Sequence, residues 1–353
     1  AMTTATTTLK QALLVSMLCL AVLASSNRVL VLVDDLAQID TFSIYFDSLR
    51  DSGFDLKFAL PDDPQTHLVD VGEFTCDKLI IFSPETDDFA NFNKDKILSF
   101  IDRGNDVLIA ASPDTASSVA NLIADNGAIP LRETTIIDHL NFDTSDPEGD
   151  HSTIIAKDFT EFSSSFLGAE KINPVLFRGT GLIVRDDNPL IAPILRASST
   201  AYARSGNAKE IPAADENKNK KKTKKKSLGA EKKNEKGSKI TLLASLQARN
   251  NARVTISGSL SLFSNQFISQ KIDVDGKSIK TGNFDLATKI TQWTFQQSKV
   301  LRLSNVKHHL VGQTEQLDTY TIREFVEYSF DVEQWDGKKW SPFNADDFQL
   351  EFQ

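Results

Sequence analysis

The amino-acid sequence predicts an α/β fold, an open and mostly parallel sheet of the flavodoxin-like or amidotransferase-like kind, followed by a β-rich second domain. Residues 28–35 place five consecutive aliphatic residues before two acids, a pattern typical of a strand buried on both faces. Further apolar runs alternate with amphipathic helices as far as Gly127. A chain of 353 residues is also long enough for two domains.

The elements of the first domain follow in order. A first helix carries apolar residues at helical spacing and ends at Gly53: Phe42, Tyr45, Phe46 and Leu49. Short apolar runs predict the next strands: residues 54–59, 78–82 and 106–111. Asn93 can cap a second helix that ends at Gly104, and Gly127 ends a third. Their apolar faces are Ile97, Phe100 and Ile101, then Val119, Leu122 and Ile123.

From about Ala128 the predicted helices become sparse. Short apolar pieces alternate with Pro, Gly and Asp clusters: residues 153–156, 175–177 and 182–184. Leu286, Ile290 and Trp293 indicate one more helix. Near the end, residues 326–333 and 348–353 alternate apolar and polar side chains, and Asp336 and Gly337 form a good turn. Because the sequence stops inside the last strand, we expect an unfinished sheet with an exposed edge.

We expect five parts along the chain. Residues 1–26 form a signal peptide, and residues 27–206 form an α/β domain with a β-rich extension. Residues 207–239 are a disordered, lysine-rich insertion. Residues 240–317 continue the α/β domain, and residues 318–353 begin a β-sandwich-like domain that is truncated.

The first 26 residues have the pattern of a secretory leader. Lys10 supplies a positive charge, residues 12–24 are apolar, and small residues follow, so cleavage after Ala24 or Ser26 is expected. The alternative is an uncleaved membrane anchor, although the apolar run is shorter than the ~20 residues that a span needs.

The formal charge of -9 hides an asymmetry. Residues 218–239 hold 11 lysines and two glutamates, which leaves 28 basic and 46 acidic residues elsewhere. The folded part is therefore acidic, which argues against nucleic acid as a partner. The run at residues 220–226 resembles a nuclear-localisation or polyanion-binding signal, but behind a leader we interpret it as a solvated loop.

The predicted carboxyl ends of the strands are where open α/β sheets bind ligands, and acids and hydroxyls gather there. They are Asp34 and Asp35, Ser83 and Glu85, and Ser112 and Asp114. A hydrolase would pair Ser112 with His139 or His151 and one of these acids. Yet neither a Gly-x-Ser-x-Gly elbow nor a cysteine elbow is present at Ser112, so loop-capping serines and acids are the better interpretation.

Other candidate sites give weak patterns. Asp138 with His139, or His308 with His309, could ligate a metal, but adjacent side chains on a strand point to opposite faces. Residues 179–181 (Gly-Thr-Gly) lack the third glycine and the strand-to-helix setting of a dinucleotide fingerprint. Cys76 precedes an apolar run and is expected to be a partly buried, inert thiol. We therefore assign no catalytic, cofactor-binding or metal-binding residue, and no cofactor.

A family resemblance indicates a function, which these residue patterns do not. Residues 246–265 resemble the signature stretch of the dolichyl-diphosphooligosaccharide–protein glycosyltransferase 48 kDa subunit family, a non-catalytic part of the oligosaccharyltransferase complex. Other matching segments follow in the same order: residues 28–35, 72–74, 77–84, 136–139, 173–181, 281–287, 308–312 and 327–329. The lysine-rich insertion is longer and more basic than the family pattern.

The resemblance implies a type I endoplasmic reticulum membrane protein with a lumenal α/β domain followed by β structure. Its complex transfers a preassembled oligosaccharide from dolichyl diphosphate to Asn-x-Ser/Thr sites, and catalysis belongs to another subunit. The implied partners are the catalytic multi-span subunit, ribophorin I-like and ribophorin II-like subunits, and small membrane subunits. The family's anchor is a C-terminal transmembrane helix, which this sequence does not reach, so we expect a truncated chain.

Two other functions stay open. One is a lumenal α/β domain that binds a sugar or lipid-phosphate group, with no role in the complex, through Asp34 and Asp35. Adjacent carboxylates repel phosphate unless a cation intervenes. The other is the hydrolase built on Ser112.

Overall fold

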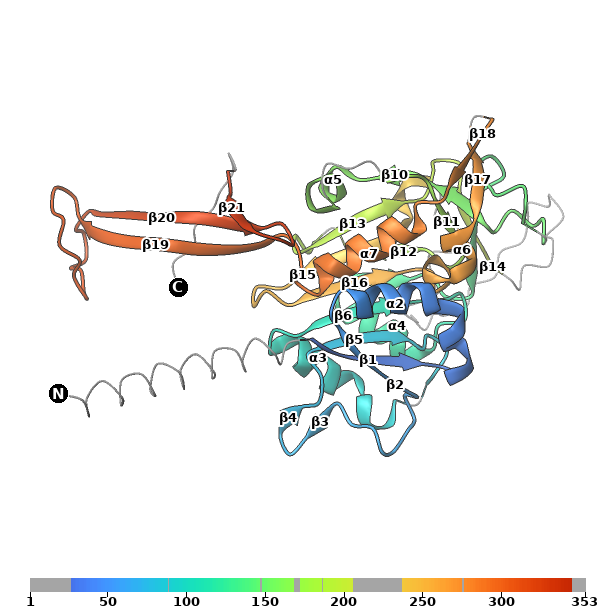
Figure 1. Ribbon diagram of the computed structural model, residues 1–353, viewed down its shortest axis with the longest axis horizontal. Helices are drawn as coiled ribbons and strands as arrows, with labels where there is room; N and C mark the ends of the chain where they lie inside the picture. Colours follow the sequence, from blue (N-terminus) through green and yellow to red (C-terminus); the bar gives the residue numbers. More distant parts are fainter. Residues whose placement is uncertain are drawn as a thin grey trace, which may run out of the picture. The chain divides into compact units, whose positions relative to one another are not determined.

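The computed structural model describes residues 27–344, except 88, 147, 168–171, 186, 206–236 and 275. The chain divides into two compact units, Ala1–Thr294 and Phe295–Gln353, whose elements are labelled in Figure 1. The expected signal peptide, most of the lysine-rich insertion and the last predicted strand lie outside the described residues. Within the described part, no helix is long and apolar enough to span a membrane.

The first unit is built on a sheet with a parallel centre. Its strands are β2 (Asp55–Ala59), β1 (Arg28–Val33), β5 (Lys78–Phe82), β6 (Asp106–Ala110) and β16 (Arg253–Ser257), each parallel to its neighbours in this order. The first four follow the flavodoxin-like order, in which the second strand of the chain lies outside the first. The predicted α/β class, with its mostly parallel sheet, is confirmed.

Beyond β16 the sheet becomes antiparallel. The next strands are β15 (Thr241–Gln247), β13 (Ile191–Arg196) and β10 (Asp158–Phe159). β12 (Leu182–Val184) pairs with both β15 and β7 (Ala128–Pro130). The chain therefore completes the parallel centre with β16, a segment that lies after the lysine-rich insertion in the sequence.

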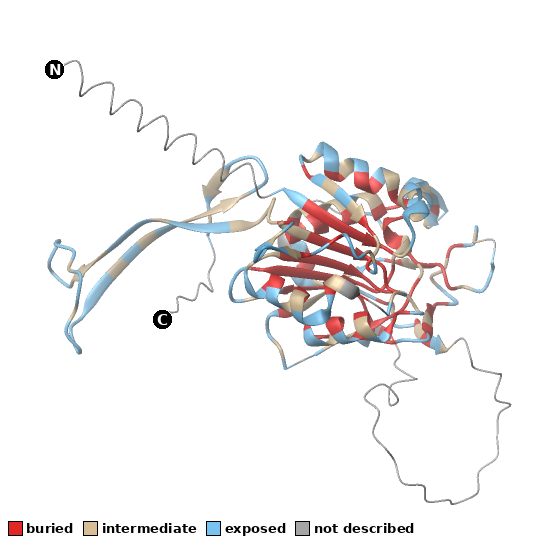
Figure 2. Cartoon of the chain, turned by 90° about the horizontal axis from the view of Figure 1, so that it is seen from below, coloured by how far each residue is buried: buried red, intermediate tan, exposed pale blue. Residues whose placement is uncertain are grey.

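Helices cover both faces of the sheet (Figure 1). α3 (Lys94–Asp102) and α4 (Ser117–Asp125) share a buried apolar cluster with Ile81 of β5. Tyr45 of α2 (Ser43–Asp51) stacks instead on Phe82, whose side chain points to the opposite face. α7 (Asn283–Thr294) packs beside α2, and Figure 2 shows the buried strands between the two helical layers.

Shorter elements complete the first unit, and four pairs of them form separate two-stranded sheets. The strands are β3 (Val69–Asp70), β4 (Glu73–Phe74), β8 (Thr134–Ile137), β9 (Ile154–Ala156), β11 (Val175–Phe177), β14 (Tyr202–Ser205), β17 (Lys271–Val274) and β18 (Lys277–Lys280). The helices are α5 (Glu161–Leu167), α6 (Asn265–Ser269) and the 3₁₀ helices η1 (Leu36–Phe42), η2 (Ala90–Phe92), η3 (Gly237–Lys239) and η4 (Ser261–Phe263).

The helix ends predicted from capping residues and glycines are confirmed. The Asn93 side chain accepts the Lys96 N–H at 3.0 Å, so Asn93 caps α3 as expected. Gly53 and Gly104 follow α2 and α3 with φ near +90°, the left-handed conformation that ends a helix.

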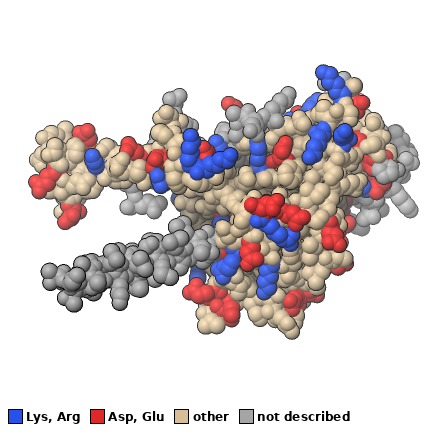
Figure 3. Space-filling view, viewed as in Figure 1, with Lys and Arg blue, Asp and Glu red and all other residues tan. Residues whose placement is uncertain are grey.

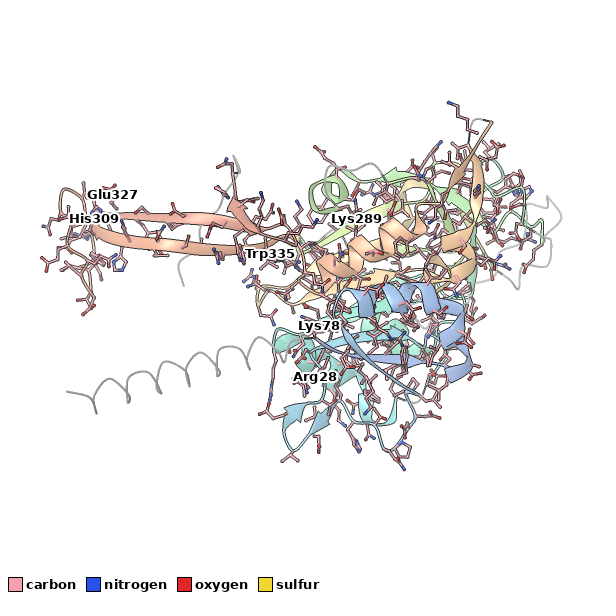
Figure 4. The ribbon with its side chains drawn as sticks, in the orientation of Figure 1. Arg28, Lys78, Lys289, His309, Glu327 and Trp335 are labelled. Atoms are coloured by element: carbon pink, nitrogen blue, oxygen red, sulfur yellow. The ribbon has the colours of Figure 1, made fainter. Side chains whose placement is uncertain are left out.

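A buried carboxylate joins the amino ends of three parallel strands. Asp106 has no exposed side-chain surface, and it pairs with the ammonium group of Lys78. It also accepts the backbone N–H of Arg253 at 2.8 Å. The Arg253 guanidinium lies over the Trp293 ring and donates to the Trp293 carbonyl at 2.6 Å. Burial lowers the pKa of Arg253 to about 10. Figure 4 labels Lys78 beside Arg28, where β5 and β1 begin.

The second unit is a long antiparallel hairpin. β19 (Val300–Leu310) pairs with β20 (Val326–Trp335), and β21 (Trp340–Pro342) pairs with β20. None of the residues of β19 and β20 is buried, as Figure 2 shows. His309 is registered opposite Glu327 at one end of the hairpin, and Trp335 lies at the other end (Figure 4).

The predicted strand at residues 326–333 and the turn after it are confirmed, because Gly337 adopts φ +100° between β20 and β21. The expected domain boundary at residues 317 and 318 lies in the loop between β19 and β20, whereas the two compact units divide at Thr294 and Phe295.

The Asp106 pair generates a stability prediction. Replacing Asp106 with alanine leaves the Lys78 ammonium largely buried without its counter-ion and the Arg253 N–H without its acceptor. We expect the free energy of unfolding to fall by about 3–5 kcal/mol, measured by urea denaturation. As a matched control, Asp47→Ala breaks an exposed pair with Arg50 and should cost less than about 1 kcal/mol. Equal losses in the two variants would contradict the central role of Asp106.

Candidate functional site

The acids predicted at the carboxyl ends of the strands lie at one edge of the sheet. Asp34 follows β1, Glu85 follows β5 and Asp114 follows β6. β1 and β5 are also the strands at which the strand order reverses, the usual ligand-binding position of open α/β sheets. Burial raises the pKa of Asp34, and burial together with the charges of Asp34 and Asp114 raises that of Glu85.

The side chains of Asp34 and Asp35 hold the local loops. The Asp34 carboxylate accepts the Thr86 hydroxyl at 2.6 Å and the Glu85 N–H at 3.4 Å. The Asp35 carboxylate caps η1 by accepting the Ala37 N–H at 2.9 Å. These contacts match the capping interpretation made from the sequence.

Ser112 has no catalytic base in the described part of the chain. Its hydroxyl makes no hydrogen bond there. The two histidines considered as its base bind each other, with their Nδ1 atoms 2.7 Å apart, and His139 Nε2 lies 2.9 Å from the Tyr202 hydroxyl. A serine nucleophile needs a base within hydrogen-bond reach, and here the candidate bases are engaged elsewhere.

Asp138 and His139 have separate partners, as expected for neighbours at the end of a strand. Asp138 is buried and accepts the hydroxyls of Ser198 and Thr200 and the Leu140 N–H. Although burial opposes ionisation, these hydrogen bonds lower the pKa of Asp138 to about 2.

His308 and His309, the other histidines considered as metal ligands, also have ordinary partners. His308 Nδ1 lies 2.6 Å from the Tyr320 hydroxyl, and His309 Nδ1 lies 3.1 Å from the Leu310 carbonyl oxygen. Across the described residues, no three His, Cys, Asp or Glu side chains are grouped so as to hold a metal ion.

A cavity of about 540 Å³ lies at the carboxyl ends of β6 and β16. Five segments that are far apart in the sequence line it: residues 111–114, 133–135, 150–152, 178–179 and 260–261. Its lining includes Ser112, whose buried hydroxyl makes no hydrogen bond with any described residue, and Ser152, whose hydroxyl and N–H both lie against the Asp150 carboxylate. The lining also includes three carboxylates and the guanidinium of Arg178. This cavity is the candidate binding site.

Comparisons with known proteins decide the family. The model of the OST48 N-terminal domain matches residues 20–297, and that of the OST48 middle domain matches residues 308–353. The chain belongs to the OST48 family. The resemblance stated from residues 246–265 and the collinear segments is confirmed.

Relatives of this OST48-family chain carry the name dolichyl-diphosphooligosaccharide–protein glycosyltransferase 48 kDa subunit. The one from Danio rerio is 39% identical over 95% of this chain and 73% of the relative. The one from Arabidopsis thaliana is 36% identical over 93% of this chain and 72% of the relative. The one from Caenorhabditis elegans is 35% identical over 93% and 71%.

Two solved structures share only a distant likeness to this chain. A ThuA-like protein from Parabacteroides merdae has a TM-score of 0.36 at 10% identity, covering 90% of this chain and 98% of its own. Alpha-L-fucosidase isoenzyme 2 from Paenibacillus thiaminolyticus has a TM-score of 0.34 at 8% identity, covering 88% and 42%. Likeness at this level carries no conclusion about function.

Two segments that carried the OST48 resemblance cross beside the cavity. The Thr180 N–H donates to the Gly258 carbonyl at 2.8 Å. A Cβ atom on Gly179 would overlap the Gly258 carbonyl oxygen, and one on Gly258 would overlap that of Thr180. The Gly-Thr-Gly sequence at residues 179–181, which is no dinucleotide fingerprint, therefore allows two backbones to touch.

Sequence reasoning found only part of the candidate binding site. It singled out Ser112 and Asp114, which follow a recognisable strand. It missed Ser152 and Arg178, which lie in irregular segments with no local pattern, and it could not foresee that β16 brings Ser261 to the same place.

The hydrogen bonds of Asp138 predict a pH-dependent loss of stability. Asp138→Asn should lower the free energy of unfolding at pH 7 by about 1.5–3 kcal/mol, the usual worth of hydrogen bonds to a charged group. Because the folded pKa lies below the unfolded value of 3.8, the contribution is complete above about pH 4 and is lost as pH falls toward 2.

Urea denaturation of both proteins from pH 7 to pH 2 measures this difference. It should shrink at the acidic end, whereas Asp70→Asn, at an exposed carboxylate of β3, should stay within about 0.5 kcal/mol of the unaltered chain. A difference for Asp138→Asn that stays constant across this range would show that the carboxylate is not the stabilising form.

Proposed function

We propose that this chain is a non-catalytic, lumenal subunit of the oligosaccharyltransferase complex. In this role it supports the en bloc transfer of oligosaccharide from dolichyl diphosphate to asparagine in Asn-x-Ser/Thr sites. The observation that carries the proposal is family membership along almost the whole chain, since the OST48 matches cover residues 20–297 and 308–353.

The side-chain geometry supports an accessory role rather than a catalytic one. Within the described residues, Ser112 lacks a base. Cys76 is 3% exposed, and burial raises its pKa to about 12, so it is a thiol and not a thiolate at neutral pH. His139, His151, His308 and His309 are bound to each other, to tyrosine hydroxyls or to the backbone.

The surface supports the proposal that the binding partners are proteins rather than nucleic acids. On the face drawn in Figure 3, acidic and basic side chains are interspersed over the first unit. The hairpin of the second unit exposes large apolar side chains, among them Ile322 at 90% and Phe325 at 83%. Exposed apolar side chains of this size are typical of chains that work in contact with other polypeptides.

The proposed setting follows from the same membership. We place the chain on the lumenal side of the endoplasmic reticulum membrane, with residues 1–26 as its signal peptide. The proposed partners are the catalytic multi-span subunit, ribophorin I-like and ribophorin II-like subunits, and small membrane subunits.

Ligand binding without a role in the complex is the second candidate function. The cavity beside β6 and β16 favours it, because its lining includes the buried Ser112 hydroxyl, which makes no hydrogen bond with a described residue. Asp34 and Asp35 support it less, since both carboxylates already bind loop groups.

Depletion of the protein in its own cells tests the subunit role. We expect the occupancy of Asn-x-Ser/Thr sites, measured by mass spectrometry, to fall across many secretory glycoproteins and to recover when the natural gene is re-expressed. A tagged copy should also co-purify with the catalytic subunit. Unchanged occupancy together with no co-purification would contradict the subunit role and favour the ligand-binding function.

A further inference from the structure

We propose that His139 and His151 form a binding site for a divalent transition-metal ion, with Zn²⁺ as the ion that their nitrogen donors fit. The proposal goes beyond the subunit role and does not depend on it. It rests on two facing imidazole nitrogens, on the contacts that hold both rings, and on the charges around them.

The two imidazole rings direct the same kind of nitrogen at one point. His139 Nδ1 and His151 Nδ1 lie 2.7 Å apart. A hydrogen bond between them needs a proton on one nitrogen, and a metal ion can take the place of that proton. Two nitrogens bound tetrahedrally to Zn²⁺ at its usual bond length lie ~3.3 Å from each other. The rings therefore need to separate by only roughly 0.6 Å to admit the ion.

Tyr202 can hold His139 in the tautomer that a metal requires. Its hydroxyl lies 2.9 Å from Nε2, the other nitrogen of the His139 ring. When Nε2–H donates to the hydroxyl oxygen, Nδ1 keeps a free lone pair that can bind a metal. Histidines that ligate metals almost always donate their second N–H to such a partner. Tyr202 is therefore a positioning residue of the proposed site.

The ring of His151 is held in place before an ion arrives. It stacks on the Phe142 ring, with centroids 3.7 Å apart and 15° between the ring planes. His151 also adopts φ +60°, the left-handed conformation that residues other than glycine seldom take. Strain of this kind persists only where the surroundings enforce it, and it is frequent at ligand sites.

The two histidines come from neighbouring segments that the backbone ties together. The Asp138 N–H donates to the His151 carbonyl at 3.3 Å. Tyr202 begins β14 and is registered opposite Ile137, the last residue of β8. A metal ion between the two rings would join these segments more tightly. It would also fix one wall of the cavity, because Asp150 of the cavity lining directly precedes His151.

The charges around the pair favour a cation. Each histidine directly follows an aspartate, Asp138 or Asp150. Although burial opposes ionisation, hydrogen bonds lower the pKa of both carboxyl groups, so both carry a negative charge at neutral pH. Arg178, whose charge also acts on Asp150, already pairs with Glu148.

Water would complete the coordination of the ion. Among the residues that the structure describes, no third His, Cys, Asp or Glu forms a metal-binding group with the two histidines. His139 is exposed and His151 is half-buried, so solvent can supply the remaining ligands. Imidazole nitrogens suit Zn²⁺, whereas Mg²⁺ and Ca²⁺ prefer oxygen ligands. The pair should therefore select Zn²⁺ over these two ions.

Calorimetric titration of the purified full chain, first freed of metal with a chelator, tests the proposal. We expect Zn²⁺ to bind saturably. NMR of the chain labelled with ¹⁵N-histidine should identify Nδ1 of His139 and of His151 as the nitrogens that bind the ion. Mg²⁺ and Ca²⁺ serve as comparison probes and should bind more weakly than Zn²⁺.

Three site variants and one control locate the binding. His139→Ala and His151→Asn should each abolish this binding, and asparagine is chosen because it tolerates the left-handed backbone. Tyr202→Phe keeps the ring but removes the hydrogen-bond acceptor, and should weaken binding about tenfold. His67→Ala removes an exposed histidine outside the pair and should leave the affinity unchanged. Circular dichroism of each variant checks that it is folded.

Absence of Zn²⁺ binding to the folded chain overturns the proposal, and so does binding that the folded His139 and His151 variants retain in full. Tighter binding of Ca²⁺ or Mg²⁺ would also contradict it, because the ion would then be held by carboxylates and not by imidazoles. Metal binding is measured on the chain alone and glycosylation on whole cells, so a negative result in one experiment leaves the other conclusion standing.

Discussion

The first unit depends on one buried charge at the start of β6. Asp106 is fully buried, pairs with Lys78 of β5 and accepts the backbone N–H of Arg253 of β16. A buried carboxylate is tolerated only when its partners are in place, so this contact favours β16 beside β6 over any other position. Arg253 then carries the link to α7, because its guanidinium binds the carbonyl and lies over the ring of Trp293.

The position of β16 decides the geometry at its other end. Where β16 ends, Gly258 touches the backbone of Thr180, and the next residues bring Ser261 to the cavity that begins at Ser112. The crossing works only with glycine at 258 and 179, since any side chain would overlap a carbonyl oxygen. The cavity is thus a consequence of strand pairing set by Asp106 at the opposite edge of the sheet.

This dependence explains which features could be predicted from the sequence. β1, β5, β6 and the helices between them carry their signals locally, in runs of aliphatic residues, in the Asn93 cap and in the glycines after each helix. The place of β16 could not be predicted, because pairing with β6 is chosen by long-range packing and by a buried ion pair. The contact between His139 and His151 was missed for the same reason: it joins two irregular segments with no periodic pattern.

The side chains that could do chemistry differ in what already binds them, and that difference indicates how the site works. Asp35 caps a helix, His139 and His151 bind each other, and the Cys76 thiol is buried. Ser112 combines a place in the cavity with a hydroxyl that makes no hydrogen bond to a described residue. A serine without a base can hold a ligand hydroxyl but cannot attack a bond. The Ser112 hydroxyl is therefore suited to binding a ligand and not to nucleophilic attack.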